Sequence, residues 1–231
     1  MSTGSWGQQQ PQGADWYQAS DGLWYPPGGG AVVPPGGALA TTGAVDVSLD
    51  APLEVNRWRP LYAWLLAIPH WIVLMVVGVV AYVAMIVAFF SILFTRKVPP
   101  WAHDWIVRLY RYQWQIMTFA WWMHEDSPEW MSTPGEIDPG TEPGRVTIRR
   151  AEELQRFGPL YKWILAIPHF FVLAILGIGV YFAVLIGFFA VLFTGKWPEG
   201  LRDFVVKFFR WATRVNAYLL IRDEYPPFAL D

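Results

Sequence analysis

The chain has 231 residues, 54% of them hydrophobic and only 16% charged, whereas a typical soluble domain has roughly 25% charged residues. Its formal net charge of −2 argues against a nucleic acid or another polyanion as the partner. It contains no cysteine, which excludes disulfides, thiolate metal sites and cysteine nucleophiles. Fifteen Trp, ten Tyr and fifteen Phe are typical of a large core or of the aromatic belts at lipid–water boundaries.

Residues 1–44 begin with neither a basic segment nor an apolar core, so they are not a secretory signal. Their Gln, Gly and Pro clusters cannot bury a core, and we predict a disordered arm. A polar arm without a signal predicts a cytoplasmic N-terminus.

One short stretch of this arm, "DWYQASDGLWYPP" at 15–27, is different. It resembles the Trp/Tyr–Asp-Gly–Tyr-Pro motifs found near the ends of many actinobacterial membrane proteins. Two interpretations stay open. The stretch is either a docking peptide for a protein partner, anchored by Trp16, Trp24 and Tyr25, or a local turn around Asp21-Gly22 without a partner.

The rest of the chain is a tandem duplication. "RPLYAWLLAIPH" at 59–70 returns as "GPLYKWILAIPH" at 158–169, an offset of 99 residues. Comparison of 47–128 with 146–227 at this offset gives 29 identities in 82 positions without a gap. We therefore divide the chain into repeat 1 (45–128), a Pro- and Gly-rich linker (129–143) expected to be exposed, and repeat 2 (144–231).

Each repeat opens with a few alternating residues, "VDVSL" at 45–49 and "RVTI" at 145–148. This period of two predicts one short strand in each copy. Two strands related by a pseudo-twofold axis would pair antiparallel, so we expect a two-stranded β-ribbon outside the membrane.

A long hydrophobic segment follows in each repeat. Residues 61–94 and 163–194 contain no Asp, Glu, Lys or Arg. A membrane-spanning helix needs only about 20 apolar residues, and a soluble helix is seldom apolar on every side over this length. The fold class predicted is thus an all-α membrane protein of two tandem helical units, in the plasma membrane and multi-pass.

Proline interrupts both segments near their start. Because proline removes a backbone donor and restricts the preceding residue, we expect a short interfacial helix, a bend at Pro69 or Pro168, and then the spanning helix. His70 and His169 follow these prolines. They either form a paired-histidine site on the pseudo-twofold axis, for haem, a metal or protons, or sit singly at the bends and bond a carbonyl or water.

The third element of each repeat, 101–123 or 200–222, carries a polar stripe at i, i+3 and i+7 along one helix face. The stripe is Arg108, Arg111 and Gln115 in repeat 1, and Lys207, Arg210 and Arg214 in repeat 2. The opposite face is aromatic, which is typical of a helix lying at a membrane surface; a return span with the stripe turned inward is the alternative. We predict that the basic residues bind anionic lipid head groups. These residues are Arg108, Arg111, Lys207, Arg210 and Arg214.

Three membrane arrangements fit the duplication: two spanning hairpins, a wedge whose basic helices lie flat on the surface, or one crossing per repeat. The hairpins are favoured because a wedge requires the hydrophobic segment to turn back inside the membrane, where turn signals are weak. Against them, the hairpins would place Arg96, Lys97 and Lys196 outside the cell, contrary to the positive-inside tendency.

The motifs "FFSILFTRKVP", "LFTGKWPEG" and "DEYPPF" resemble a bacterial membrane-protein family, domain-of-unknown-function family 4389, present here twice over about 45–230. The resemblance implies a membrane location and no defined activity. Repeat 1 departs from the pattern at Arg96, where repeat 2 has Gly195, so its turn is expected to differ.

No Ser-His-Asp order, phosphate loop or metal-ligand spacing is present, so we predict neither an enzyme nor a cofactor or metal. A non-catalytic scaffold or lipid-interacting protein is the first hypothesis, with membrane lipids, another membrane protein or a second copy as partners. The alternative is a small transporter or redox-associated subunit that uses the pseudo-twofold interface and the paired histidines.

Overall fold

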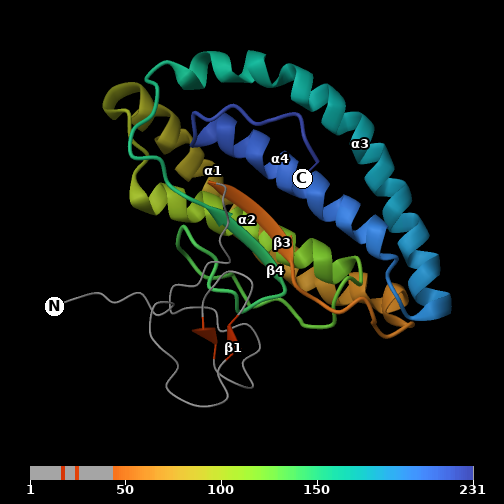
Figure 1. Cartoon of the computed structure of the whole chain (residues 1–231). Helices are drawn as coiled ribbons and strands as arrows, with labels where there is room; N and C mark the ends of the chain where they lie inside the picture. Colours follow the sequence, from red (N-terminus) through yellow and green to blue (C-terminus); the bar gives the residue numbers. More distant parts are fainter. Residues whose placement is uncertain (1–16, 19–23, 26–43, 231) are drawn as a thin grey trace. The chain divides into compact units, whose positions relative to one another are not determined.

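The computed structural model describes residues 17–18, 24–25 and 44–230, and the chain divides into two units, 1–42 and 43–231 (Figure 1). In the first unit, β1 (Tyr17–Gln18) pairs antiparallel with β2 (Trp24–Tyr25). An antiparallel pair is the arrangement expected on the two sides of a turn. The predicted arm otherwise lies outside the described residues.

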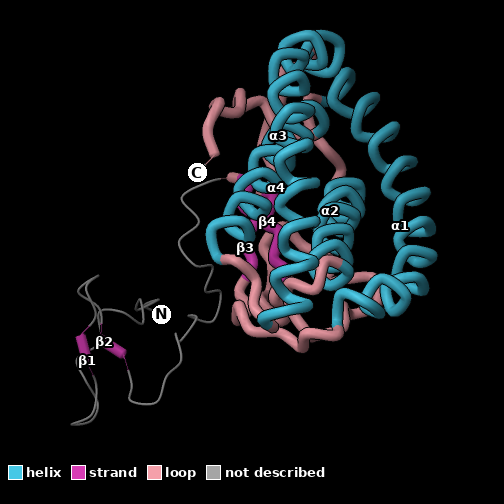
Figure 2. Tube along the Cα trace, turned by 90° about the vertical axis from the view of Figure 1, so that its right-hand side faces the viewer, coloured by secondary structure: helices cyan, strands magenta, loops and turns pink. Residues whose placement is uncertain are grey.

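The second unit contains four helices, two in each repeat. These are α1 (Arg59–Thr95), α2 (Pro100–Ala120), α3 (Gly158–Thr194) and α4 (Glu199–Leu220). In each repeat the long apolar helix packs along the shorter one as a hairpin (Figures 1 and 2). The predicted class of two tandem helical units, each with one long apolar helix, is confirmed.

The turn between the two helices of a hairpin has the same backbone conformation in both repeats. Arg96 has φ 61° and ψ 17°, and Gly195 has φ 71° and ψ 15°, both in the left-handed region. The expectation of a different turn in repeat 1 was therefore wrong. Arg96 adopts a conformation that suits glycine, and its backbone N–H closes α1 on the Ile92 carbonyl.

The expectation of a separate short helix before each proline was also wrong. Pro69 and Pro168 lie inside continuous helices of 37 residues each. Proline removes one hydrogen bond and bends a helix without having to end it, and Figure 1 shows α3 following an arc around α4. In α1, Ala67 before the proline and Val77 after it both pack against α2, which holds the two parts in one helix.

The long helices bury small residues and expose large ones. On α1, alanines at 63, 67, 81, 84 and 88 are buried, so α2 approaches closely. Met75 of α1 and Phe171 of α3 are 75% and 70% exposed, as are many other large apolar side chains of these helices. An apolar outer surface of this size is unusual for a soluble protein.

The predicted β-ribbon is present and joins the two repeats. Strand β3 (Val45–Leu49) pairs antiparallel with β4 (Gly144–Ile148), with Val47 opposite Val146. Strand β3 of repeat 1 packs on α4 of repeat 2, and β4 of repeat 2 packs on α2 of repeat 1. Figure 2 shows the sheet on the side of the molecule opposite α1, with α2 and α4 between them.

The loops exchange contacts between repeats in the same reciprocal way. The Val55 N–H donates to the Gly195 carbonyl at 2.9 Å, and at the equivalent positions the Leu154 N–H donates to the Arg96 carbonyl at 2.8 Å. The start of each long helix therefore lies beside the end of the other. Helices α1 and α3 are antiparallel and are related by a pseudo-twofold axis that passes through the sheet.

Candidate functional site

The central arginine of each predicted basic stripe bonds the strand supplied by the other repeat. Arg111 Nε donates to the Val146 carbonyl at 3.1 Å, and Arg210 Nε donates to the Val47 carbonyl at 2.9 Å. Both pairs are equivalent at the offset of 99. These two arginines therefore join the helices to the sheet on both sides of the pseudo-twofold axis.

Arg111 is enclosed by protein. Its side chain is 0% exposed, forms an ion pair of 2.8 Å with Asp138, and donates further bonds to the Thr133 and Gly135 carbonyls of the linker. Burial lowers the pKa of Arg111, and Asp138 opposes that shift. The head-group role predicted for Arg111 is incompatible with this enclosure. Nothing in the sequence indicated the enclosure, because the linker that covers Arg111 was expected to be exposed.

The other stripe residues have different surroundings. Arg108 is half-buried, with its guanidinium 4.6 Å from the ring centre of Trp105. Lys207, its counterpart in repeat 2, is exposed, and Arg214 is half-buried one helical turn beyond Arg210. Repeat 2 therefore presents its basic side chains more openly than repeat 1.

The two histidines are buried within their own repeats. His70 Nδ1 is 2.9 Å from the Tyr112 hydroxyl, and its ring stacks on Trp130 at 4.4 Å. Trp211 Nε1 donates to His169 Nδ1 at 3.3 Å, and Phe228 stacks on that ring at 3.9 Å.

Tyr112 and Trp211 occupy equivalent positions, so each histidine joins its long helix to the short helix of the same repeat. The contacts bring neither histidine to the other. Within the described residues there is also no group of three or more His, Cys, Asp or Glu side chains that could hold a metal ion.

A third histidine was missed by the sequence reasoning. His124, 2% exposed, lies 3.0 Å from the Thr118 hydroxyl through Nε2. Burial, together with the charge of Arg59, lowers its pKa to about 4. A lone histidine between Met and Glu carries no pattern that would have identified this environment.

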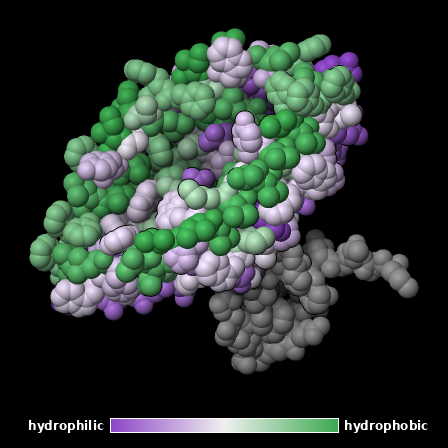
Figure 3. Space-filling model, turned by 180° about the vertical axis from the view of Figure 1, so that it is seen from behind, coloured by the Kyte–Doolittle hydropathy of each residue, from purple (hydrophilic) through white to green (hydrophobic). Residues whose placement is uncertain are grey.

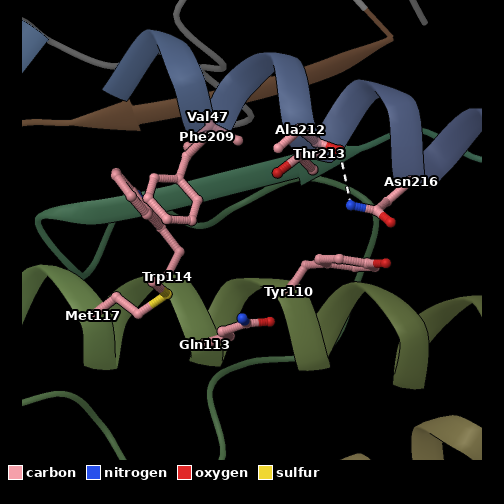
Figure 4. A pocket seen from close by; sticks show the side chains of 9 residues that line it. All are labelled: Val47, Tyr110, Gln113, Trp114, Met117, Phe209, Ala212, Thr213 and Asn216. Atoms are coloured by element: carbon pink, nitrogen blue, oxygen red, sulfur yellow. Dashed lines mark hydrogen bonds between the residues drawn. The ribbon is translucent and has the colours of Figure 1, made fainter. Parts of the chain in front are cut away.

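A cavity of about 290 Å³ lies on the pseudo-twofold axis between α2 and α4 (Figure 4). Eight of its nine lining residues form four pairs at the repeat offset, and the ninth is Val47 of β3. The pairs are Tyr110 and Phe209, Gln113 and Ala212, Trp114 and Thr213, and Met117 and Asn216. None of these side chains is charged. No sequence signal marks them, because every position from 47 to 128 has a counterpart at the offset of 99.

The cavity has an aromatic end and a polar end. In Figure 4, Phe209, Trp114 and Met117 lie together, and Asn216 and Tyr110 face each other at the other end. The rings of Trp114 and Phe209 are 5.0 Å apart. The Asn216 amide donates to the Ala212 carbonyl at 2.9 Å, which leaves its side-chain oxygen as an acceptor.

Of the predicted docking anchors, Trp24 and Tyr25 form β2, and Trp16 lies outside the described residues. The pairing of β1 with β2 places Tyr17 opposite Tyr25 and Gln18 opposite Trp24. Docking by this motif stays a prediction.

Comparison with known families gives one result. The model of a domain of unknown function, DUF4389, matches residues 59–132 and 159–230. The chain belongs to this family. It contains two tandem DUF4389 copies, and its two long helices are apolar enough to cross a membrane. Neither curated proteins nor solved structures include a match to the chain. Both strands of the central sheet lie outside the matched DUF4389 regions.

Proposed function

We propose that this DUF4389 protein is a non-catalytic, lipid-interacting protein of the plasma membrane that lies within one leaflet. In this arrangement α1 and α3 are immersed parallel to the membrane plane, α2 and α4 lie at the level of the head groups, and the sheet faces water. The main support for this arrangement is the path of the chain between α2 and α3.

Residues 121–157 run from the end of α2 to the start of α3. The start of α3 lies beside the end of α1, because the Leu154 N–H bonds the Arg96 carbonyl. This connection contains no helix and has twelve acidic or basic residues. If the helices crossed the bilayer, it would have to cross as well. Non-helical backbone exposed to lipid leaves its polar groups unsatisfied at several kcal/mol each, so perpendicular helices are disfavoured.

The position of the sheet leads to the same conclusion. It is attached at Arg111 and Arg210, near the middle of α2 and α4. Spanning helices would hold an open two-stranded sheet, with the charged side chains of Asp46 and Arg145, at the centre of the hydrocarbon. Sheet edges do not occur there. Helices that lie in the plane leave the sheet in water.

The outer faces of the long helices suit lipid. Trp64 and Trp163 are 55% and 56% exposed, yet each indole N–H donates to a carbonyl of its own helix, at 2.9 and 2.8 Å. Neither donor therefore needs water. Figure 3 shows hydrophobic residues along the two ridges of this face, with a hollow between them.

Lys207 and Arg214 are suitably placed for anionic head groups. They flank Arg210, which bonds the sheet, and lie near Trp211, which bonds α3. Their side of α4 therefore lies between the water-facing sheet and the lipid-facing helix, where each cation contributes about 1 kcal/mol. The transporter hypothesis requires a passage across the bilayer, which helices in one leaflet do not provide.

Labelling of single cysteines tests the orientation, since the chain has none of its own. Four exposed positions are suitable: Arg57, Lys97, Glu152 and Lys196. With an impermeant maleimide on intact cells and on inverted vesicles, all four substitutions to Cys should react from the same side. Reaction of Arg57→Cys and Lys97→Cys, which lie at opposite ends of α1, from opposite sides would refute the in-plane arrangement.

Vesicle binding tests the head-group contacts separately. Lys207→Gln with Arg214→Gln should weaken binding to vesicles containing phosphatidylglycerol by roughly 30-fold, since two cations together contribute about 2 kcal/mol. Arg149→Gln with Arg150→Gln is the charge-matched control, because both residues are exposed and directly follow β4 of the water-facing sheet. Equal binding by the double variant and the control would remove Lys207 and Arg214 from the interface.

A further inference from the structure

The cavity on the pseudo-twofold axis lies where a lipid molecule could enter it. Its walls are α2 and α4, and Val47 of the sheet contributes to its floor. No residue of α1 or α3 lines it. Seen from the side opposite the sheet, the surface is hollowed between the ridges of α1 and α3, and hydrophilic residues are visible in the hollow (Figure 3).

We propose that this cavity binds an uncharged single-chain lipid whose small head carries hydroxyl or ester oxygens, the monoacylglycerol class. The inference rests on the proposed function, because the ligand would enter from the leaflet that surrounds α1 and α3. It assigns to this DUF4389 protein a defined ligand in addition to general contact with lipid.

The lining excludes a charged head. A phosphate or carboxylate in a site without a cation would lose its hydration without a counter-charge, which is costly. No basic residue of the stripes lines the cavity. Arg111 and Arg210 bond the sheet instead, and Lys207 is exposed on α4. The cavity and the head-group residues are therefore separate sites.

The polar end matches hydroxyl groups, which both donate and accept. Within the described part of the chain, no hydrogen bond joins the Tyr110 hydroxyl or the Gln113 side chain to another residue, and Asn216 keeps its side-chain oxygen as an acceptor. The Tyr110 hydroxyl and the Gln113 amide can donate to a hydroxyl or ester oxygen, and the Asn216 oxygen can accept from a hydroxyl. An apolar molecule would leave all three unpaired, which disfavours pure hydrocarbon.

The aromatic end and the size limit the rest of the ligand. Trp114, Phe209 and Met117 provide an apolar contact for the first carbons of one chain. A volume of about 290 Å³ is at the lower end of the range for small-ligand sites. It accommodates a glycerol-sized head and the start of one tail, while the remaining tail lies in the hollow among the lipids of the leaflet.

Photolabelling tests the assignment with the full chain in phosphatidylcholine vesicles. The probe is a monoacylglycerol with a diazirine near the ester, and the comparison lipids are a fatty acid and a phosphatidylcholine with the same tail. Adducts are mapped by mass spectrometry. We expect adducts in 110–117 and 209–216 to be about tenfold more abundant for the monoacylglycerol, the factor that one buried hydrogen bond provides.

Two variants make the result specific. Ala212→Trp fills the cavity and should abolish its label while labelling of α1 and α3 persists. Asn216→Leu, with a side chain of similar size, removes the polar pairing and should lower the label about tenfold. Tyr82→Leu, on the exposed face of α1, is the control and should leave the cavity label unchanged.

Flotation of the same vesicles separates the two proposals. Two results with a chain that floats would overturn the cavity assignment and leave the proposed function intact. One is equal labelling by all three lipids, and the other is equal labelling of Ala212→Trp and the unmodified chain. If Ala212→Trp fails to fold, an unchanged label in Asn216→Leu overturns it equally. Chain that does not float contradicts the proposed function and, with it, this inference.

Discussion

Replacing Arg111 with methionine separates an internal role for this arginine from contact with lipid. Arg111→Met removes the hydrogen bonds to three carbonyls and leaves Asp138, 4% exposed at its side chain, without its counter-charge. Breaking a buried ion pair from one side costs about 3–5 kcal/mol. At about 2–4 °C for each kcal/mol, the midpoint of thermal unfolding should fall by roughly 6–20 °C.

Repeat 2 provides the matched control. Arg210 bonds Val47 as Arg111 bonds Val146, but its ion pair with Asp46 is 21% and 24% exposed at the two side chains. Water can solvate Asp46 when the arginine is lost, so Arg210→Met should cost only about 1–2 kcal/mol. The unequal loss at two equivalent positions is the expected signature of burial.

The assay is thermal unfolding in detergent micelles, followed by the fluorescence of the chain's fifteen tryptophans. Addition of Asp138→Asn to Arg111→Met should recover part of the loss, because it removes the uncompensated charge. The reasoning is refuted if Arg111→Met leaves the midpoint unchanged but weakens binding to anionic vesicles. That result would place Arg111 at the membrane surface.

Three further predictions concern other parts of the protein. The folded pKa of His124 is about 4, below the ordinary 6.5, so the unfolded chain binds more protons between these pH values. The free energy of unfolding therefore decreases as the pH falls from 6.5 to 4. His124→Asn should reduce this decrease by about 3 kcal/mol, measured as the free energy of unfolding against pH. Arg96→Gly should raise the unfolding midpoint, since it relieves about 1 kcal/mol of left-handed backbone cost; a lower midpoint would show that the Arg96 side chain outweighs that cost. Gly187→Ala would place Cβ 2.4 Å from the Trp197 ring and should cost about 1–3 kcal/mol. Repeat 1 has Ala and Val at these two positions, so adding Trp197→Val to Gly187→Ala should remove that penalty. If the effects of the two substitutions on the free energy of unfolding were strictly additive, direct packing between them would be contradicted.

The elements that depend on local pattern could be predicted from the sequence. The strands were found because alternation in both copies has a period of two, and Val47 does pair with Val146. The long helices were found because they are apolar on every side. The prolines were misjudged, since a proline weakens a helix locally and the packing of residues on both sides, such as Ala67 and Val77 on α2, decides whether it ends.

The basic stripes show why the site was only partly predictable. Spacing places Arg108, Arg111 and Gln115 on one face of α2, and it says nothing of what covers that face. The cover on Arg111 comes from the linker and from β4, both later in the chain and part of neither helix. A charged face that another segment of the chain encloses has the same sequence pattern as one that faces lipid head groups.

The exchange of strands between repeats gives the duplication a physical reason. A single repeat would hold a strand without its main helix partner, which lies in the other repeat, and an arginine, such as Arg111, without the strand carbonyl that it bonds. Two copies satisfy both needs reciprocally, as an isologous dimer does. Joining them in one chain through the linker, residues 129–143, makes that pairing independent of concentration. It also allows the two halves to diverge, as they have where Gln113 has Ala212 as its counterpart and where Met117 has Asn216. An asymmetric cavity with one aromatic and one polar end is available only to a fused pair, because an exact twofold would make both ends alike.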